Sequence, residues 1–202
     1  MIAETRIHMD NRRLLKFEIG FLTCLVLITL FTTQALVHNY SDAKPAFVLH
    51  PAAHLIPATS VSAVEKSGPN LVLTNQSTHI FQPDTWVVDE QVFVSNSNLN
   101  DSVAWVLTGL TPGRKRLRLY LTKSNDYGIV QLFINGNQMG AGIDLFDRTV
   151  RSMPAVDMGM VEIEKNESSM TLRLQVVGKN SQASAPFYQF GVQGFALEPV
   201  VP

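Results

Sequence analysis

The sequence contains very little cysteine and almost no excess of charge of either sign. Cys24 is the only cysteine in 202 residues, and it lies inside an apolar run. An intrachain disulfide is therefore excluded, as is a CxxC metal or redox site. The 16 Lys and Arg residues nearly balance the 17 Asp and Glu residues, leaving a formal net charge of −1. This balance gives no electrostatic reason to expect nucleic acid as a partner.

The motifs of several enzyme classes are also missing from the sequence. It contains no GxSxG, no P-loop and no dinucleotide-binding fingerprint. His79 is the only histidine after residue 54, so a Ser-His-Asp triad is not indicated. Nothing in the sequence demands catalysis, and we assign no catalytic residue and no metal ligand.

One long hydrophobic run lies near the N-terminus, at residues 17–37. The stretch from Ile19 to Val37 carries no charge, and about 20 apolar residues suffice for a helix to cross the bilayer core. Four basic residues precede the run, whereas Lys44 is the only basic residue shortly after it. By the positive-inside rule, we expect a basic cytoplasmic tail at 1–16 and a transmembrane signal anchor at 17–37. This predicts a single-pass membrane protein whose C-terminal domain is periplasmic or extracellular.

Two alternatives for this run remain open at the level of sequence. Its densest apolar part, 20–31, has the length of a signal-peptide core, and Thr33-Gln34-Ala35 is an acceptable cleavage site. A buried helix of a soluble protein is the other alternative. The continuation of the run through Val37 favours the anchor.

Residues 38–69 show no hydrophobic period and are interrupted by four prolines. Proline disfavours regular structure, and the Ala, Ser and Thr residues between the prolines bury little surface. We therefore predict an extended tether at 38–69, followed by a folded domain at 70–202.

From Asn70 onward, short apolar runs alternate with turn residues such as Pro112-Gly113 and Asn135-Gly136. This spacing is typical of a β-sandwich, and no stretch with helical period occurs after residue 40. The predicted fold class is all-β, a single β-sandwich or jelly roll of the galactose-binding-like kind, preceded by one transmembrane helix. The predicted strands are Asn70–Thr74, Val87–Ser95, Ser102–Leu110, Arg116–Thr122, Gly128–Asn135, Asp157–Glu164, Met170–Val177 and Phe187–Leu197.

Alternation within the strands predicts which side chains enter the core. In residues 116–122 the leucines face one way, while Arg116, Arg118 and Tyr120 face the other, which predicts a wet face. Trp105 is in register with Val103 and Leu107 and is predicted to be core. A buried Gln131 would need hydrogen-bond partners.

A series of short motifs in the C-terminal half agrees in order and spacing with a known family. The motifs are Thr122-Lys-Ser-Asn-Asp-Tyr-Gly-Ile-Val-Gln131, Ile134-Asn-Gly136, Ile143-Asp-Leu-Phe-Asp147, Val176-Val-Gly-Lys-Asn180 and Tyr188-Gln-Phe-Gly191. They resemble the C-terminal jelly-roll half of the fructofuranosidase/arabinofuranosidase-like glycoside hydrolases, long labelled a domain of unknown function. Similar stand-alone modules occur in planctomycete-type bacterial surface proteins. The resemblance implies a β-sandwich linked to carbohydrate, but those hydrolases contain two jelly rolls, and no catalytic acid carries over to this chain.

The ligand-binding prediction concerns two acidic loops within these motifs. Asn125, Asp126 and Tyr127 combine an amide, a carboxylate and an aromatic ring, which suits the hydroxyls and the apolar face of a sugar. Asp144 and Asp147 lie in the second loop, and we expect the loop 144–147 to lie near the wall of the site that 124–127 would form. The competing interpretation is structural, with Asn125 and Asp126 capping a turn and Tyr127 filling the sandwich edge. No cofactor is predicted, and a structural calcium ion held by Asp144 and Asp147 is an alternative.

Three functions follow from these patterns. The first is a membrane-tethered, non-catalytic module that binds carbohydrate or serves in cell-envelope assembly. The second is a glycosidase, or a subunit of one, acting on furanosides. The third is a structural module that docks an envelope protein through its β-sandwich.

Overall fold

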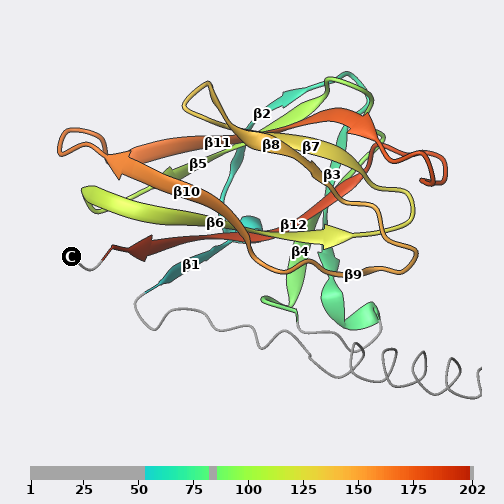
Figure 1. Cartoon of the computed structure of the whole chain (residues 1–202), viewed down its shortest axis with the longest axis horizontal. Helices are drawn as coiled ribbons and strands as arrows, with labels where there is room; N and C mark the ends of the chain where they lie inside the picture. The colour runs from blue at the N-terminus through green and yellow to red at the C-terminus, as the bar shows by residue number, and fades with distance from the viewer. Residues whose placement is uncertain (1–52, 82–85, 201–202) are drawn as a thin grey trace, which may run out of the picture. The chain divides into compact units, whose positions relative to one another are not determined.

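The computed structural model describes residues 53–81 and 86–200, which form two antiparallel β-sheets packed face to face (Figure 1). Sheet A contains β10 (Val156–Ile163), β6 (Gly113–Lys123), β12 (Phe190–Pro199), β4 (Glu90–Ser95) and β3 (Val72–Ser77) in this order, with β1 (His54–Pro57) beside β12 and β9 (Arg151–Ser152) beside β6. Sheet B contains β2 (Ala63–Ser67), β5 (Ser102–Thr108), β11 (Ser169–Lys179), β7 (Gly128–Ile134) and β8 (Asn137–Asp144). Short 3-10 turns, η1 (Ala58–Ser60) and η2 (Thr78–Ile80), follow β1 and β3.

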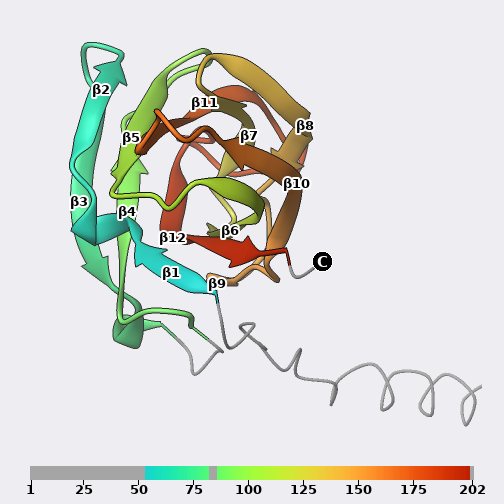
Figure 2. The ribbon, with the colours of Figure 1, turned by 90° about the vertical axis from the view of Figure 1, so that its left-hand side faces the viewer.

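The view turned by 90° shows the two layers end on (Figure 2). The chain repeatedly crosses from one sheet to the other, for example from β4 to β5 and from β6 to β7. Each sheet thereby covers the apolar face of the other, which confirms the predicted all-β sandwich.

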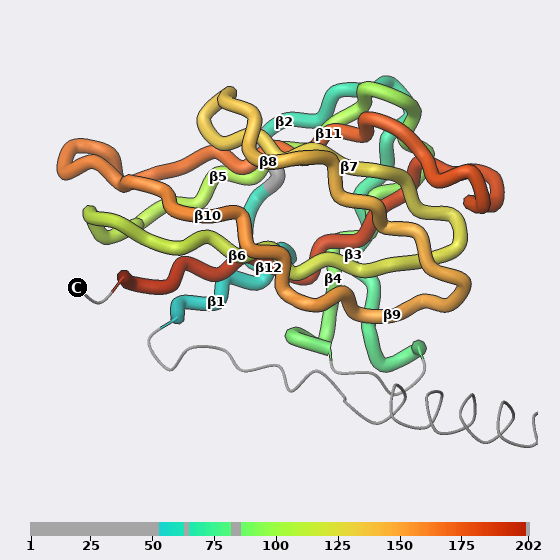
Figure 3. The backbone as a smooth tube through the Cα atoms, viewed as in Figure 1, coloured from blue at the N-terminus to red at the C-terminus, as the bar shows by residue number. Residues whose placement is uncertain are grey.

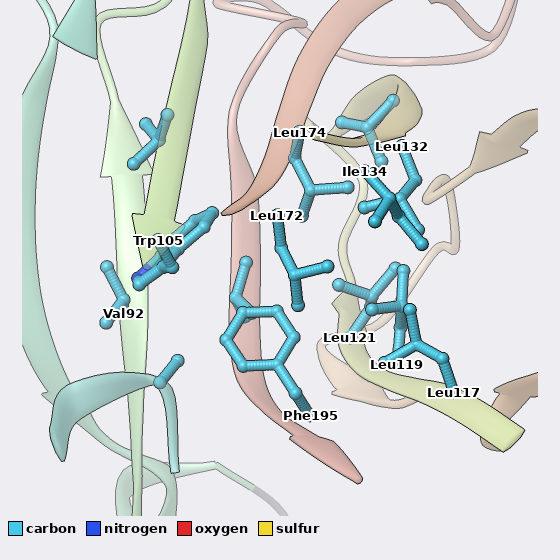
Figure 4. Packing of buried hydrophobic residues seen from close by; sticks show 14 of the residues in the cluster. Val92, Trp105, Leu117, Leu119, Leu121, Leu132, Ile134, Leu172, Leu174 and Phe195 are labelled. Carbon is cyan, nitrogen blue, oxygen red and sulfur yellow. The ribbon is translucent and has the colours of Figure 1, made fainter. Parts of the chain in front are cut away.

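The core lies between the sheets and is made by the alternating residues (Figure 4). Leu117, Leu119 and Leu121 of β6 are all fully buried, as the alternation predicts. Trp105 of β5 is also fully buried, and its ring packs against Phe195 of β12 at a centroid distance of 5.7 Å. The predicted core position of Trp105 is confirmed.

All eight predicted strands are present, but the folded domain begins earlier than Asn70. β1 pairs with β12 from His54↔Leu197 to Pro57↔Gly194, and β2 pairs with β5. The predicted tether at 38–69 is therefore wrong for residues 54–67. Proline misled the prediction, because Pro57 ends β1 instead of preventing a strand.

The predicted cytoplasmic tail at 1–16 and transmembrane anchor at 17–37 lie outside the described residues. Within 53–81 and 86–200, no helix has the length and apolarity needed to cross a membrane.

Local polar chemistry fixes the β7–β8 hairpin. Asn135 and Gly136 both have positive φ, at 47° and 86°, as a tight two-residue turn requires. Gln131 is buried, and its amide donates to the carbonyl oxygens of Met139 and Leu132 at 2.7 and 3.1 Å. These contacts provide the partners that a buried Gln131 requires, at the point where the β7–β8 register shifts.

The outer face of sheet A is less exposed to solvent than the sequence predicts. Tyr120 points away from the core leucines but is only 1% exposed. Arg118 is half-buried, and its Nε lies 2.9 Å from Glu198 Oε1 on the neighbouring strand β12. Burial, together with the negative charge of Glu198, raises the pKa of Tyr120, and the charge of Arg118 partly offsets this. The predicted wet face is thus wrong at Tyr120.

Candidate functional site

Four connections meet at one end of the sandwich, the right-hand side in Figures 1 and 3. They are residues 96–101 after β4, 124–127 after β6, 145–150 after β8 and 180–189 after β11. We call this region the amide-rich end, because these segments contain Asn96, Asn98, Asn100, Asn125, Asn180, Gln182 and Gln189.

Backbone hydrogen bonds hold the four connections together. Ser124 N donates to Leu145 O at 3.1 Å, and Asp147 N donates to Ser124 O at 3.1 Å. Ser184 N donates to Asn125 O at 2.7 Å, so the segment 180–189 lies against 124–127. The two loops that the sequence predicts as neighbours, 124–127 and 144–147, are therefore adjacent in space.

Asn125 and Asp126 occupy the turn between β6 and β7. Asn125 is exposed. Asp126 is half-buried, and its carboxylate accepts hydrogen bonds from Ser124 Oγ at 2.6 Å and Gln189 Nε2 at 2.8 Å. This turn therefore presents an exposed amide, whose Oδ1 accepts from Ser124 Oγ at 3.3 Å, beside a carboxylate that is held in place from two sides.

Tyr127 belongs to the core and does not form a binding surface. It is 3% exposed, and its ring stacks on Phe93 at a centroid distance of 6.2 Å. Burial raises the pKa of its hydroxyl above the ordinary value, the charge of Asp126 adds to this, and a hydrogen bond with Gln91 opposes it. The structural interpretation is the one that the geometry supports for this residue.

Asp144 and Asp147 are each engaged by neighbours of their own. Asp144 accepts from Phe146 N at 2.9 Å and from Asn180 Nδ2 at 2.6 Å. Asp147 accepts from Thr149 N at 3.2 Å and pairs with Arg151. Partial burial pushes the pKa of Asp147 upward, but the Thr149 hydrogen bonds and the Arg151 charge outweigh it, so the pKa lies below its usual value.

Protein groups donate hydrogen bonds to the carboxylates of both Asp144 and Asp147. In the part of the chain that the structure describes, no three side chains of His, Cys, Asp or Glu are grouped where they could hold a metal ion. The Asp144 and Asp147 loop is built by hydrogen bonds from protein groups.

Two aromatic side chains, Phe187 and Tyr188, lie beside the amides and outside the two acidic loops predicted as the site. Phe187 and Tyr188 are half-buried and meet edge to face at 6.0 Å. Lys179 Nζ lies 3.7 Å from the centroid of the Phe187 ring, a cation–π contact. Tyr188 is anchored through its backbone, since its carbonyl accepts from Ser97 Oγ at 2.5 Å.

The connection 96–101 was also missed by the sequence analysis. Asn96, Asn98 and Asn100 are exposed, and Asn96 and Asn100 have positive φ. The dense run of Asn and Ser at 95–102 could have indicated this loop, because Asn tolerates the left-handed region.

Other aromatic and basic side chains of types that could contact a sugar lie elsewhere. Trp86 lies on the β3–β4 connection, where its ring contacts Phe81 at 5.6 Å. Tyr120 and Arg118 lie within β6, on the outer face of sheet A. None of these three belongs to the amide-rich end.

Comparisons with known proteins agree with the fold. A scan against models of protein families gives no match, and no curated protein sequence matches the chain. Among solved structures, the chain is similar to a Paenibacillus xanthan lyase, with a TM-score of 0.58 and 21% identity over 77% of this chain. The chain spans 14% of the length of that lyase. At this identity the similarity shows a shared fold and nothing about activity.

Smaller structures give weaker similarity over nearly their whole length. A family 35 carbohydrate binding module from Clostridium thermocellum has a TM-score of 0.41 and 11% identity, over 73% of this chain and 98% of the module. The CBM36-1 domain of a multidomain xylanase from the hindgut metagenome of Trinervitermes trinervoides has a TM-score of 0.41 and 15% identity, over 74% and 99%. Scores this low do not establish a relationship. The class that the architecture defines is a β-sandwich domain.

Proposed function

We propose that this chain is a non-catalytic, carbohydrate-binding β-sandwich module that binds its ligand at the amide-rich end. The observation that carries the proposal is the concentration of exposed amides beside the Phe187–Tyr188 aromatic pair. An amide both donates and accepts hydrogen bonds, as the hydroxyls of a sugar do, and an aromatic ring packs against the apolar face of the sugar.

The rigidity of this end supports the same proposal. Asp126 is fixed by Ser124 and Gln189, and Tyr188 is fixed through Ser97. Binding a flexible polysaccharide costs less free energy when the protein groups are already ordered. The exposed Asn125 side chain then needs little reorganisation to meet a ligand.

The state of the carboxylates favours binding over hydrolysis. Glycoside hydrolysis needs two carboxyl groups facing one cleft, one of which holds a proton for the leaving group. Asp126 and Asp144 are instead each used as acceptors by two protein donors. We therefore assign both to the support of the loops.

The finer parts of the proposal rest on the sequence. The resemblance to the jelly-roll half of the fructofuranosidase/arabinofuranosidase-like hydrolases makes furanose-containing glycans the first ligands to test. The uncharged run at 17–37 and the basic residues before it support a membrane tether, with the N-terminus cytoplasmic and the β-sandwich on the opposite side.

Binding of the full-length chain to a glycan array, with detergent in every buffer, tests the proposal. Asn125→Ala and Phe187→Ala should each reduce the signal on the bound glycans. Asn166→Ala is the matched control, because Asn166 is exposed on the β10–β11 hairpin, away from the four connections. Failure of the wild-type chain to bind any glycan would refute the proposal, and so would equal losses in all three variants.

A further inference from the structure

A second surface lies on the outer face of sheet B, outside the amide-rich end. Because Leu172 and Leu174 of β11 point into the core, Thr171, Arg173 and Gln175 point outward. Arg173 is paired in register with Phe133 of β7, and its guanidinium carbon lies 4.0 Å from the centroid of the Phe133 ring. Both side chains are half-buried.

The three middle strands of this sheet carry only cationic charge, and the acidic residues of the sheet, Glu65 and Asp144, belong to its edge strands β2 and β8. Strands β5, β7 and β11 contain only two charged residues, Arg173 and Lys179, and both are cationic. Within the described residues, Arg173 makes no ion pair, and its Nη1 donates to Gln175 Oε1 at 3.3 Å. A guanidinium has five N–H donors in a planar fork, so most of its donors remain available on this face.

The face continues into the amide-rich end along β11. Asn180 lies seven positions after Arg173, which corresponds to about 23 Å of extended strand. Gln175 and the exposed Val177 lie between them. On the adjacent strand, the Ile129 side chain packs over Gly142 and Gly178.

We infer that the outer face of sheet B extends the carbohydrate site and selects an acidic polysaccharide whose sugars carry carboxylates. Arg173 binds a carboxylate through its planar fork, Phe133 holds the guanidinium in its orientation, and Gln175 adds an amide beside it. This inference rests on the proposed function, since the amide-rich end would bind the same polysaccharide chain. The alternative is that Arg173 only shields Phe133 from water.

A matched pair of polymers separates these two roles. Polygalacturonate and its methyl ester share one backbone and differ in the charge of the carboxyl group. Affinity electrophoresis of the full-length chain measures its retardation by each polymer at low and at moderate salt. The wild-type chain should be retarded more strongly by polygalacturonate, and added salt should weaken that retardation only for the charged polymer.

Arg173→Gln should weaken binding of polygalacturonate by about tenfold, because one charge-assisted bidentate contact is lost. Arg173→Lys should recover part of it, since the charge is retained without the planar fork. Lys66→Gln is the control for net charge, because Lys66 is an exposed residue of the edge strand β2. Melting temperatures of all variants report whether the fold is intact.

The outcomes distinguish this inference from the proposed function. Equal retardation of the wild-type chain by the two polymers overturns the inference, as does an Arg173→Gln variant that binds polygalacturonate unchanged. Neither result touches glycan binding at Asn125 and Phe187. A wild-type chain that is retarded by neither polymer overturns the inference, and the glycan array then decides the proposed function separately.

Discussion

Arg118 and Glu198 form an ion pair across strands β6 and β12, with 2.9 Å between Nε and Oε1, and the Glu198 side chain is only 11% exposed. A carboxylate at this depth depends on its partner, because removing one member of a buried pair leaves an uncompensated charge. The pair also explains why Arg118 is half-buried, although the alternation of β6 places this residue on the face predicted to be solvent-exposed.

Arg118→Met should therefore lower the free energy of unfolding by about 1–3 kcal/mol, more than an exposed ion pair would account for. Glu198→Gln in the Arg118→Met background should restore part of the loss, because the stranded charge is gone. Urea unfolding of the four members of this double-mutant cycle measures the coupling. Arg114→Met, at an exposed position of the same strand, is the control and should change little. Additive effects of Arg118 and Glu198 would contradict this account of the pair.

Tyr127 provides a test of the core edge. Tyr127→Ala should lower the free energy of unfolding by about 3–5 kcal/mol, because it removes a ring that is 3% exposed and stacks on Phe93. Tyr127→Phe keeps the ring and loses only the hydroxyl, so its cost should be about 1 kcal/mol. Chemical denaturation followed by circular dichroism measures both values. A stable Tyr127→Ala chain that had lost glycan binding would instead make the ring part of the ligand site.

The pKa of Asp147 predicts a dependence of stability on pH. Its pKa is lower in the folded chain than the unfolded value of about 3.9. The stabilisation by Thr149 and Arg151 is therefore complete above the unfolded pKa and is lost as the pH falls through the folded pKa. Asp147→Asn should destabilise the chain at neutral pH, and its deficit should shrink below about pH 4.

Urea midpoints at a series of pH values measure this deficit. Glu164→Gln is the control, because Glu164 is exposed and pairs with no basic residue of the described chain. Its difference from the wild-type chain should stay small at every pH. An Asp147→Asn deficit that is independent of pH would show that the carboxylate charge is not what stabilises the loop.

The start of the folded domain can be tested by truncation. A chain that begins at residue 53 retains β1 and β2, whereas a chain that begins at residue 70 loses the pairing of β1 with β12 and of β2 with β5. The chain that begins at residue 70 also loses Ala58, which is fully buried in the core. The shorter chain should lack a cooperative thermal transition, and the longer one should show it. Equal melting temperatures of the two chains would show that residues 53–69 are not needed for the fold and that the folded domain begins at Asn70.

Side-chain alternation made most of the fold predictable and also set the limit of the prediction. It located the core face of β6 and the burial of Trp105, because leucines and aromatic residues repeat there with period two. β1 is four residues long and ends in proline, and β8 contains Gly140 and Gly142, so neither shows a clear alternation. Such strands form because their neighbours offer unpaired backbone groups, which no local pattern reports.

The candidate site was predictable to a smaller extent. The loops that contain Asp126 and Asp144 were expected near each other because both are acidic loops within the family-like motifs, and backbone hydrogen bonds of Ser124 join them. The direction of Tyr127 was not predictable, because an aromatic residue at a strand start can face either the core or solvent. Phe187 was missed because its contact with Lys179 depends on the course of a loop between two strands.

The pairing of β1 with β12 has a mechanical consequence. The chain enters β1 at His54, opposite Leu197, and runs toward Gly194, so its entry point lies far from the amide-rich end that precedes Phe190. Tension between residue 53 and a ligand held at that end acts along the axis of β1. All the hydrogen bonds between β1 and β12 then share the load in shear and do not open one after another. If the chain is anchored through its N-terminal segment, this geometry would let the domain resist a larger pulling force while it holds a bound polymer. A first strand whose hydrogen bonds broke one at a time would separate at a lower force.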